Sequence, residues 1–218
     1  LLSLYRISPN KTSIIPTWVD TKKVRNIPRK ENWFIKKHKL KNKFVIMYSG
    51  NQGRGHDFKT IIETASLLNQ FKEFIFIFIG NGQQNKYLIN EVKRLNLRNC
   101  MFLPFQNLKD IPYSLSAADI SIVTLKKNVE GIIAPSKLYG YFSTSIPVAA
   151  ISSKNSYLKK IIEENNCGKW FLNNDFENFA KWIISSNQNK KNLQIMGKNG
   201  RDFILKNATL EICCAKYK

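Results

Sequence analysis

The chain has 218 residues, enough to bury one substantial hydrophobic core, so we expect a single domain with terminal extensions. Hydrophobic residues make up 43% of the sequence, but no apolar run approaches the roughly 20 residues of a membrane-spanning helix. The 35 Lys and Arg against 15 Asp and Glu give a net charge of +20, which favours phosphates, nucleic acids or anionic lipid surfaces as partners.

Three observations narrow the choice of partner and compartment. Much of the positive charge has a plain interpretation as solvated surface, and no nucleic-acid module or basic-aromatic pattern is present, so nucleic acid is not expected. The four cysteines lack metal-ligand or redox spacing and are predicted to be free thiols in a reducing compartment. The opening LLSLYRISP lacks the features of a signal peptide, and without an initiator Met the chain is expected to be an excised part of a longer protein.

Residues 1–42 are rich in Pro, Lys and Asn and are predicted to be a connector that leads into the domain. The domain itself is expected to span 43–206. It begins with the apolar run FVIMYS, the Gly-rich loop GNQGRGHD and a helical pattern over FKTIIETASLLNQF. A second unit repeats this order as FIFIFIG, GNGQQN and KYLINEVKRLNL.

Three shorter units follow. MFLPF and DISIVTL are predicted strands, DIPYSLSAA and SKLYGYFST are predicted helices, and IPVAAIS with SYLKKIIEENN forms the next pair. Residues 168–172 are expected to add a last short strand, two or three helices follow from residue 175, and 207–218 form a tail helix. Alternation of this kind predicts an α/β, doubly wound parallel sheet of Rossmann-like type. In such sheets the ligand binds outside the carboxyl ends of the strands.

Two loops carry candidate binding residues. The loop from Gly50 to Asp57 places glycines, Arg54 and His56 before a helix, which suits an anion, although a tight turn would also explain the glycines. His56 is expected to be a near-neutral donor to a phosphate, with a depressed pKa or a salt bridge to Asp57 as the structural alternative.

In the loop EGIIAPSK, Glu130 can accept paired sugar hydroxyls, and Lys137 with amides at a helix start can neutralise a pyrophosphate. Helix initiation by Pro135 and Ser136, with Glu130 as a solvated charge, is the alternative.

The motifs YSGNQGRGHDF, FIGNGQQ, FLPFQNLKDIPYSLSAADISIVTL and EGIIAPSKLYGYFSTSIPVAA, in this order, resemble the carboxyl-terminal domain of group 1 (family 4) glycosyltransferases with the GT-B fold. The resemblance is to the exopolysaccharide and colanic-acid branch and extends over 14–206. It implies one half of a GT-B fold that binds a nucleotide-diphosphate sugar. Residues 14–20 resemble the passage between the two domains.

The resemblance also implies the site residues. The donor diphosphate would contact Gly50, Asn51, Gly53, Arg54, His56, Pro135, Ser136 and Lys137. Glu130 and Gly131 would contact the donor sugar, and Phe105 and Gln106 would meet the base. The second glutamate of the family's pair is absent, since Gly140 or Leu138 stands there, and the acceptor-binding amino-terminal domain is not in this sequence.

The expected function is that of the donor half of a hexosyl-type glycosyltransferase, which transfers a glycosyl unit from a nucleotide-diphosphate sugar, with UDP-sugar favoured, to a lipid-linked or polysaccharide acceptor. No metal, bound cofactor or catalytic residue is assigned. The expected location is cytoplasmic, with an anionic inner-membrane face as a further partner. The alternatives are a non-catalytic nucleotide-sugar-binding remnant or subunit without its acceptor domain, and a nucleotide-sugar epimerase of the same overall fold.

Overall fold

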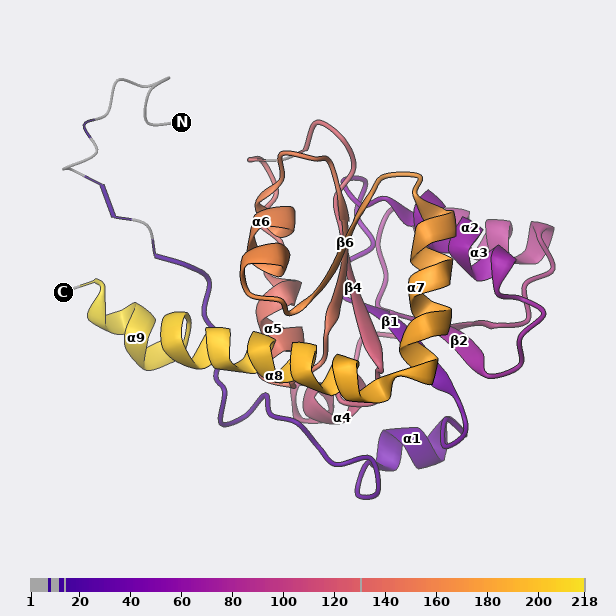
Figure 1. Cartoon of the computed structure of the whole chain (residues 1–218), viewed down its shortest axis with the longest axis horizontal. Coiled ribbons are helices and arrows are strands. Elements are labelled where there is room, and N and C mark those ends of the chain that lie inside the picture. Colours follow the sequence, from indigo (N-terminus) through magenta and orange to yellow (C-terminus); the bar gives the residue numbers. More distant parts are fainter. Residues whose placement is uncertain (1–7, 9–11, 14, 130, 218) are drawn as a thin grey trace.

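The computed structural model describes residues 8, 12, 13, 15–129 and 131–217, so Ile14 and Glu130 lie outside the described residues. Its centre is a sheet of six parallel strands (Figure 1). They are β1 (Phe44–Ser49), β2 (Phe74–Ile79), β3 (Cys100–Leu103), β4 (Ile120–Thr124), β5 (Val148–Ser152) and β6 (Gly168–Leu172). Their order is β3-β2-β1-β4-β5-β6, which confirms the predicted doubly wound sheet and its last short strand.

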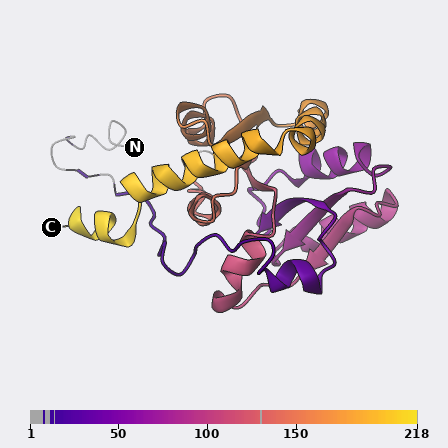
Figure 2. The ribbon, with the colours of Figure 1, turned by 60° about the horizontal axis from the view of Figure 1, so that its bottom comes forward.

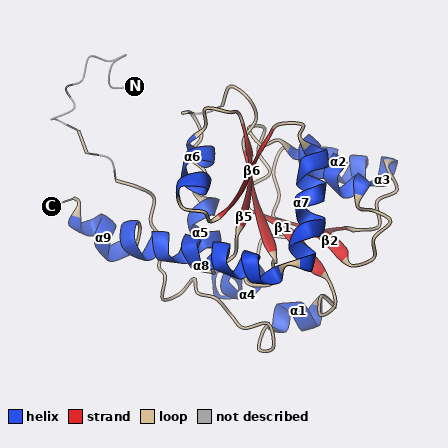
Figure 3. Ribbon diagram, in the orientation of Figure 1, coloured by secondary structure: helices blue, strands red, loops and turns tan. Residues whose placement is uncertain are grey.

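Helices connect the strands and end the chain (Figure 3). They are α1 (Trp33–Lys37), α2 (Phe58–Leu67), α3 (Asn85–Arg94), the 3-10 helix η2 (Leu108–Asp110), α4 (Ile111–Leu115), α5 (Lys137–Ser143), α6 (Tyr157–Glu164), α7 (Phe176–Gln188), α8 (Lys190–Asn207) and α9 (Leu210–Ala215). Side chains cap several of them, as where Ser156 accepts from the amide of Lys159 and Thr209 from that of Ile212. The tail from residue 175 thus holds three helices, as predicted.

The strands are buried on both faces, because successive side chains point to opposite sides of the sheet. From β1, Phe44, Ile46 and Tyr48 join a core that α2, α3 and α7 cover. Val45 and Met47 point the other way, into a core with α1 and residues that follow α4. Helices α5 and α6 cover β4 and β5 in a third cluster. The result is a three-layer arrangement with the sheet in the middle.

The segment before β1 packs against the sheet more closely than a connector needs to. Phe34 of α1 is fully buried in the core on β1 and β2, and the side-chain amide of Asn32 donates to the backbone oxygen of Tyr113 at 2.8 Å. The sequence pattern hid this helix, because its apolar run is only three residues long and is surrounded by lysines. The domain boundary at residue 42 stays a prediction.

Helix α8 runs across the amino edge of the sheet, away from the loops that follow the strands (Figure 2). It packs Leu193 into the core on one face of the sheet and Ile204 into the core on the other. Gly197 allows the close approach, since a Cβ there would lie 2.0 Å from the backbone oxygen of Ser145. The helix therefore ties together both layers at this edge.

The remaining features concern the cysteines and the length of the helices. All four cysteines are free, and Cys167 and Cys213 are buried, as predicted for thiols without a redox partner. Within the described residues, no helix has the length and apolar character needed to cross a membrane.

Candidate functional site

The strand order places its switch point between β1 and β4, because the chain leaves these neighbouring strands toward opposite sides of the sheet. Ser49 ends β1 and Thr124 ends β4, so the loops that follow them meet at the carboxyl edge. The backbone amide of Asp57, in the loop after β1, donates to the hydroxyl of Thr124 at 3.2 Å. The Gly-rich loop therefore crosses the position where a doubly wound sheet binds its ligand.

Side-chain amides fasten the loop after β1 to the loop after β2. Gln52 is fully buried, its backbone oxygen accepts from the amide of Gln84 at 2.9 Å, and its side-chain oxygen accepts from Asn85 at 2.8 Å. The side chain of Gln84 in turn donates to the backbone oxygens of Gly53 at 2.7 Å and His56 at 3.0 Å. These hydrogen bonds hold the two loops together.

Two glycines after β2 bring these loops into direct contact. Gly80 has φ of +117°, and a Cβ on it would lie 2.3 Å from the backbone oxygen of Gly50 and 3.0 Å from the ring of Phe105. Gly82 has φ of +151° and packs in the same way against the side chain of Asn51. Only glycine fits both the backbone conformation and the space at these two positions. They join predicted diphosphate residues to the predicted base residue Phe105.

Lys137 is the cation that reaches this loop cluster. Its Nζ lies 3.3 Å from Nε2 of His56 and 5.1 Å from the centre of the Tyr48 ring. Its side chain passes so close to Gly50 that a Cβ there would lie 2.6 Å from its Cε. Burial lowers the pKa of Lys137 to about 8. The structure therefore brings Lys137 of one candidate loop against His56 and Gly50 of the other, although Lys137 and His56 are 81 positions apart in the sequence.

His56 positions the ammonium group of Lys137 by a hydrogen bond. Its side chain is only 7% exposed, and Nδ1 lies 2.7 Å from the backbone oxygen of Thr124. Because a carbonyl oxygen can only accept, Nδ1 carries the ring proton and Nε2 is left to accept from Lys137. Burial and, secondarily, the neighbouring Lys137 lower the pKa of His56, so the ring is neutral. In this arrangement the single N–H of the neutral ring is used by Thr124, so the expected direct donation from His56 to a phosphate is not supported, and its contact with the site runs through Lys137.

Asp57 does not pair with His56. Its carboxylate accepts from the amide of Thr60 at 3.2 Å, the hydroxyl of Thr60 at 2.6 Å and the side-chain amide of Asn173 at 2.8 Å. It is therefore the cap of α2 and links that helix to the segment after β6. Of the two structural alternatives for His56, the salt bridge to Asp57 is not formed, whereas burial lowers the pKa of the imidazole.

Other predicted residues have less definite surroundings. Arg54 is exposed on the loop, and Gln106 donates to the backbone oxygen of Pro104 at 2.7 Å. Ser136 occupies the residue before α5 but makes no capping hydrogen bond with its side chain. Gly131 is exposed at φ of +78°, and with Pro135 and Ser136 it lines a hollow of 270 Å³. Glu130, the predicted sugar contact, lies outside the described residues.

Sequence reasoning missed the residues that hold the site in place. Gln52 and Gln84 lie in the loop motifs, but the sequence predicts no role for them. The hydroxyl of Tyr141 also holds the site, because it accepts from the backbone amide of Ser49 and donates to its backbone oxygen. The amide side chains beside the glycines were a usable signal, because buried loops need partners for their backbone groups. No signal in the sequence indicated the Tyr141 contact, because it joins residues 92 positions apart. The described residues contain no cluster of His, Cys, Asp and Glu suited to a metal ion.

The sheet order and the glycine-rich loops at its switch point define the class of protein, which is the doubly wound α/β half of a GT-B glycosyltransferase fold. The chain belongs to the family of glycosyl transferases group 1, whose family model matches residues 29–203. This confirms the family that the loop motifs indicated. The match begins at residue 29, so it includes α1.

Two curated relatives are described as glycosyltransferases. The chain is 30% identical over 164 residues to the probable glycosyltransferase WbjE of Pseudomonas aeruginosa, which covers 73% of this chain and 40% of WbjE. It is 33% identical over 97 residues to the putative colanic acid biosynthesis glycosyl transferase WcaI of Escherichia coli, or 44% of this chain and 24% of WcaI. The chain thus spans less than half the length of either relative.

Solved structures share the fold. Anabaena HepE in complex with UDP-glucose superimposes with a TM-score of 0.80 at 16% identity, over 96% of this chain and 57% of HepE. The carboxyl-terminal domain of the group 1 glycosyltransferase LpcC from Francisella tularensis gives a TM-score of 0.70 at 18% identity, over 88% of this chain and 99% of that domain. The second comparison matches this chain to a carboxyl-terminal GT-B half.

Proposed function

We propose that this chain binds a nucleotide-diphosphate sugar, with UDP-sugar favoured, as the donor half of a hexosyl-type glycosyltransferase. The observation that carries the proposal is the position of Lys137, whose ammonium group reaches the Gly-rich loop at the switch point of the sheet. HepE, which shares the fold, has been crystallised with UDP and with UDP-glucose. A cation beside a glycine-rich loop suits a diphosphate.

The proposed contacts follow the arrangement of the loops. Lys137, Arg54, His56 and the Gly-rich loop, with Pro135 and Ser136, would surround the diphosphate. Phe105 is 59% exposed beside Gly80, and its ring offers a stacking surface for the base, next to Gln106. Glu130 and Gly131 would contact the sugar. These contacts remain proposals, and the residues among them that the structure describes share a location at the carboxyl edge.

The chemistry proposed for this half is stabilisation of the leaving nucleotide diphosphate. As the glycosyl bond breaks, negative charge grows on the β-phosphate, and a positioned lysine stabilises that charge without a large rearrangement. The acceptor, a lipid-linked or polysaccharide chain, would bind to an amino-terminal domain, either in the same polypeptide or as a partner. The transfer is proposed to take place in the cytoplasm.

Calorimetric titration with UDP, GDP and ADP tests donor binding. We expect one nucleotide to be preferred and its affinity to fall about tenfold or more in Lys137→Met, because a charge-assisted contact is lost. Lys191→Met, an exposed lysine on α8, is the matched control and should bind as the unmodified protein does. A folded protein that binds none of the three nucleotides would refute the proposal and indicate a remnant whose site needs its partner or no longer works.

Binding alone does not separate an enzyme from a nucleotide-sugar-binding subunit. The gene sequence does: an acceptor domain encoded in frame upstream supports the transferase, whereas a start codon near Leu1 supports the subunit. If the transferase is correct, release of UDP from UDP-sugar should require both halves and should fall in Lys137→Met.

A further inference from the structure

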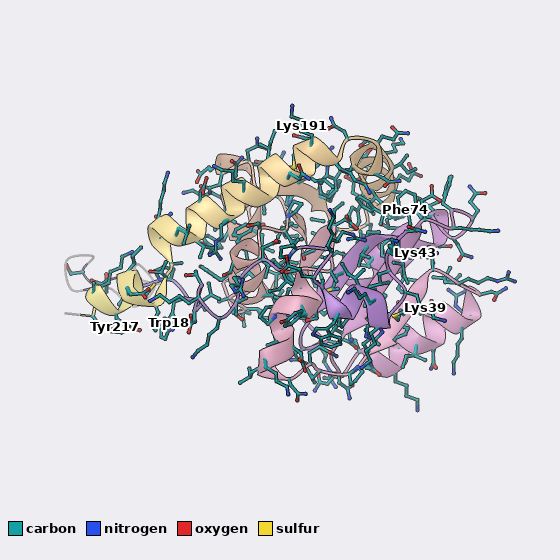
Figure 4. The ribbon with its side chains drawn as sticks, turned by 90° about the horizontal axis from the view of Figure 1, so that it is seen from below. Trp18, Lys39, Lys43, Phe74, Lys191 and Tyr217 are labelled. Carbon is teal, nitrogen blue, oxygen red and sulfur yellow. The ribbon has the colours of Figure 1, made fainter. Side chains whose placement is uncertain are left out.

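Positive charge is concentrated in the segment 29–43, which includes α1. Seven of its 15 residues are Lys or Arg, and Glu31 is its single acidic residue. The segment leads into β1, so it lies at the amino edge of the sheet, at the opposite end from the proposed donor site. Figure 4 views this edge from below and labels Lys39, Lys43 and Lys191 on it. Lys190 and Lys191, at the start of α8, extend the same basic edge.

The basic residues surround a hollow instead of being scattered. A hollow of 620 Å³ is lined by Arg29, Lys30, Ile35, Lys36, Lys39 and Lys41. Arg29 also lines a neighbouring hollow of 480 Å³, to which Lys190 and Lys198 contribute. The acidic residue of that second hollow is Asp119, which already pairs with Arg29 at 3.5 Å. The two hollows share Arg29, and lysines line both of them.

Arg29 and the lysines have different roles in this surface. The guanidinium of Arg29 donates to the backbone oxygens of Leu40 and Lys43, both at 3.0 Å, so it holds the segment against the domain. Lys30, Lys36, Lys39 and Lys41 are exposed, and among the described residues none of these four has an ion-pair partner. Their charges are therefore not neutralised within the fold.

We propose that this amino-edge surface docks on an anionic lipid bilayer. The free cations are all lysines, which act as point charges toward a diffuse negative surface, whereas specific phosphate recognition favours the fork of arginine. None of the large apolar side chains exposed in the described part of the chain lies within 29–43, so the surface lacks the stacking platform that single-stranded nucleic acid needs. Docking here leaves the carboxyl edge open to a soluble donor.

Vesicle co-sedimentation tests the proposal with phosphatidylcholine vesicles, with and without phosphatidylglycerol. We expect binding only with phosphatidylglycerol and a steep loss of binding as salt is raised. Replacing Lys30, Lys36, Lys39 and Lys41 by Gln should lower the partition coefficient at least about a hundredfold, since each lysine near the surface contributes about fivefold. The same four positions changed to Arg should retain binding.

A control variant separates the surface from net charge. Lys86, Lys93, Lys154 and Lys181 are also exposed but lie on α3, after β5 and on α7, and their change to Gln removes the same charge. This variant should keep most of its vesicle binding, and all variants should keep their thermal midpoint. Any of three results would overturn the proposal. They are equal losses of binding in both Gln variants, binding that does not depend on phosphatidylglycerol, and displacement from vesicles by transfer RNA at equal phosphate concentration. None of these readouts depends on nucleotide-sugar binding.

Discussion

At the amino edge of the sheet, α8 approaches the segment before β5 so closely that Gly197 has no room for a side chain, and Gly200 packs in the same way against Phe142. At the carboxyl edge, the loops after β1 and β2 also meet through glycine backbone, but the polar side chains of Gln52 and Gln84 join them in addition. Close packing of backbone against backbone makes the first edge rigid. Hydrogen-bonded loops leave the second edge with polar groups and exposed side chains that a ligand can contact.

The comparison predicts which property a substitution at each edge should change. A substitution at the amino edge alters packing shared by two layers, so it should change the free energy of unfolding. A substitution at the carboxyl edge removes a polar contact, so it should change ligand affinity more than stability. The five predictions below test this division, beginning with the largest expected effect.

Gly197→Ala should lower the free energy of unfolding by about 3 kcal/mol, because the new Cβ overlaps the backbone oxygen of Ser145 and α8 must move. Urea unfolding measures the change. Gly140→Ala is the matched control, since a Cβ there would meet only Leu115 at an ordinary 3.5 Å. It should be neutral or stabilise α5 by up to about 1 kcal/mol. Equal effects of the two substitutions would contradict the close packing of α8.

Asp57→Ala should lower the free energy of unfolding by about 2 kcal/mol, because α2 loses its cap and the buried amide of Asn173 loses an acceptor. Asp57→Asn keeps an oxygen for the cap and should cost less. Chemical denaturation of both variants provides the measurement. This residue is the exception at the carboxyl edge, and a loss of nucleotide affinity without a loss of stability would show that it has a binding role instead.

The affinity for UDP should fall about tenfold between pH 7 and pH 9, because Lys137, with a pKa near 8, loses its positive charge over this range. Titration calorimetry at several pH values measures the decline. In Lys137→Met the decline should be largely absent, which separates this lysine from other groups that titrate at high pH. An unchanged pH profile in the variant would remove Lys137 from the diphosphate site.

The same pKa predicts the opposite trend for stability without ligand. Between pH 8 and the ordinary pKa of 10.5, the unfolded chain holds the Lys137 proton and the folded chain does not. The unfolded state then binds more protons, so the contribution of Lys137 to the free energy of unfolding rises with pH in this window. The difference between the protein and Lys137→Met, measured by urea unfolding, isolates that contribution.

His56→Phe should weaken UDP binding about fivefold, because Lys137 loses the acceptor that positions its ammonium group. Phenylalanine retains ring packing against Tyr48 and Phe58, so the loop should stay folded. The diagnostic readout is the pH midpoint of binding, which should move to lower pH when the ammonium form loses its partner. A fivefold loss with an unchanged midpoint would indicate a structural effect alone.

The repeated strand-loop-helix order could be predicted from the sequence, because apolar runs of strand length alternate with helical periodicity over most of the chain. The sequence also indicated the two loops that carry the site, since glycines and a helix start leave visible signals, and the loop motifs gave the family correctly. It did not reveal α1, whose three apolar residues are too few to show a period between lysines.

Only the tertiary structure placed Lys137 against His56 and Gly50, because the order of strands, which decides which loops meet, depends on contacts between distant parts of the chain. It also decided that His56 is buried and neutral, since a pKa depends on surroundings that local sequence does not contain. The same reason applies to the basic amino edge: the lysines were visible in the sequence, but their gathering around one hollow required the fold.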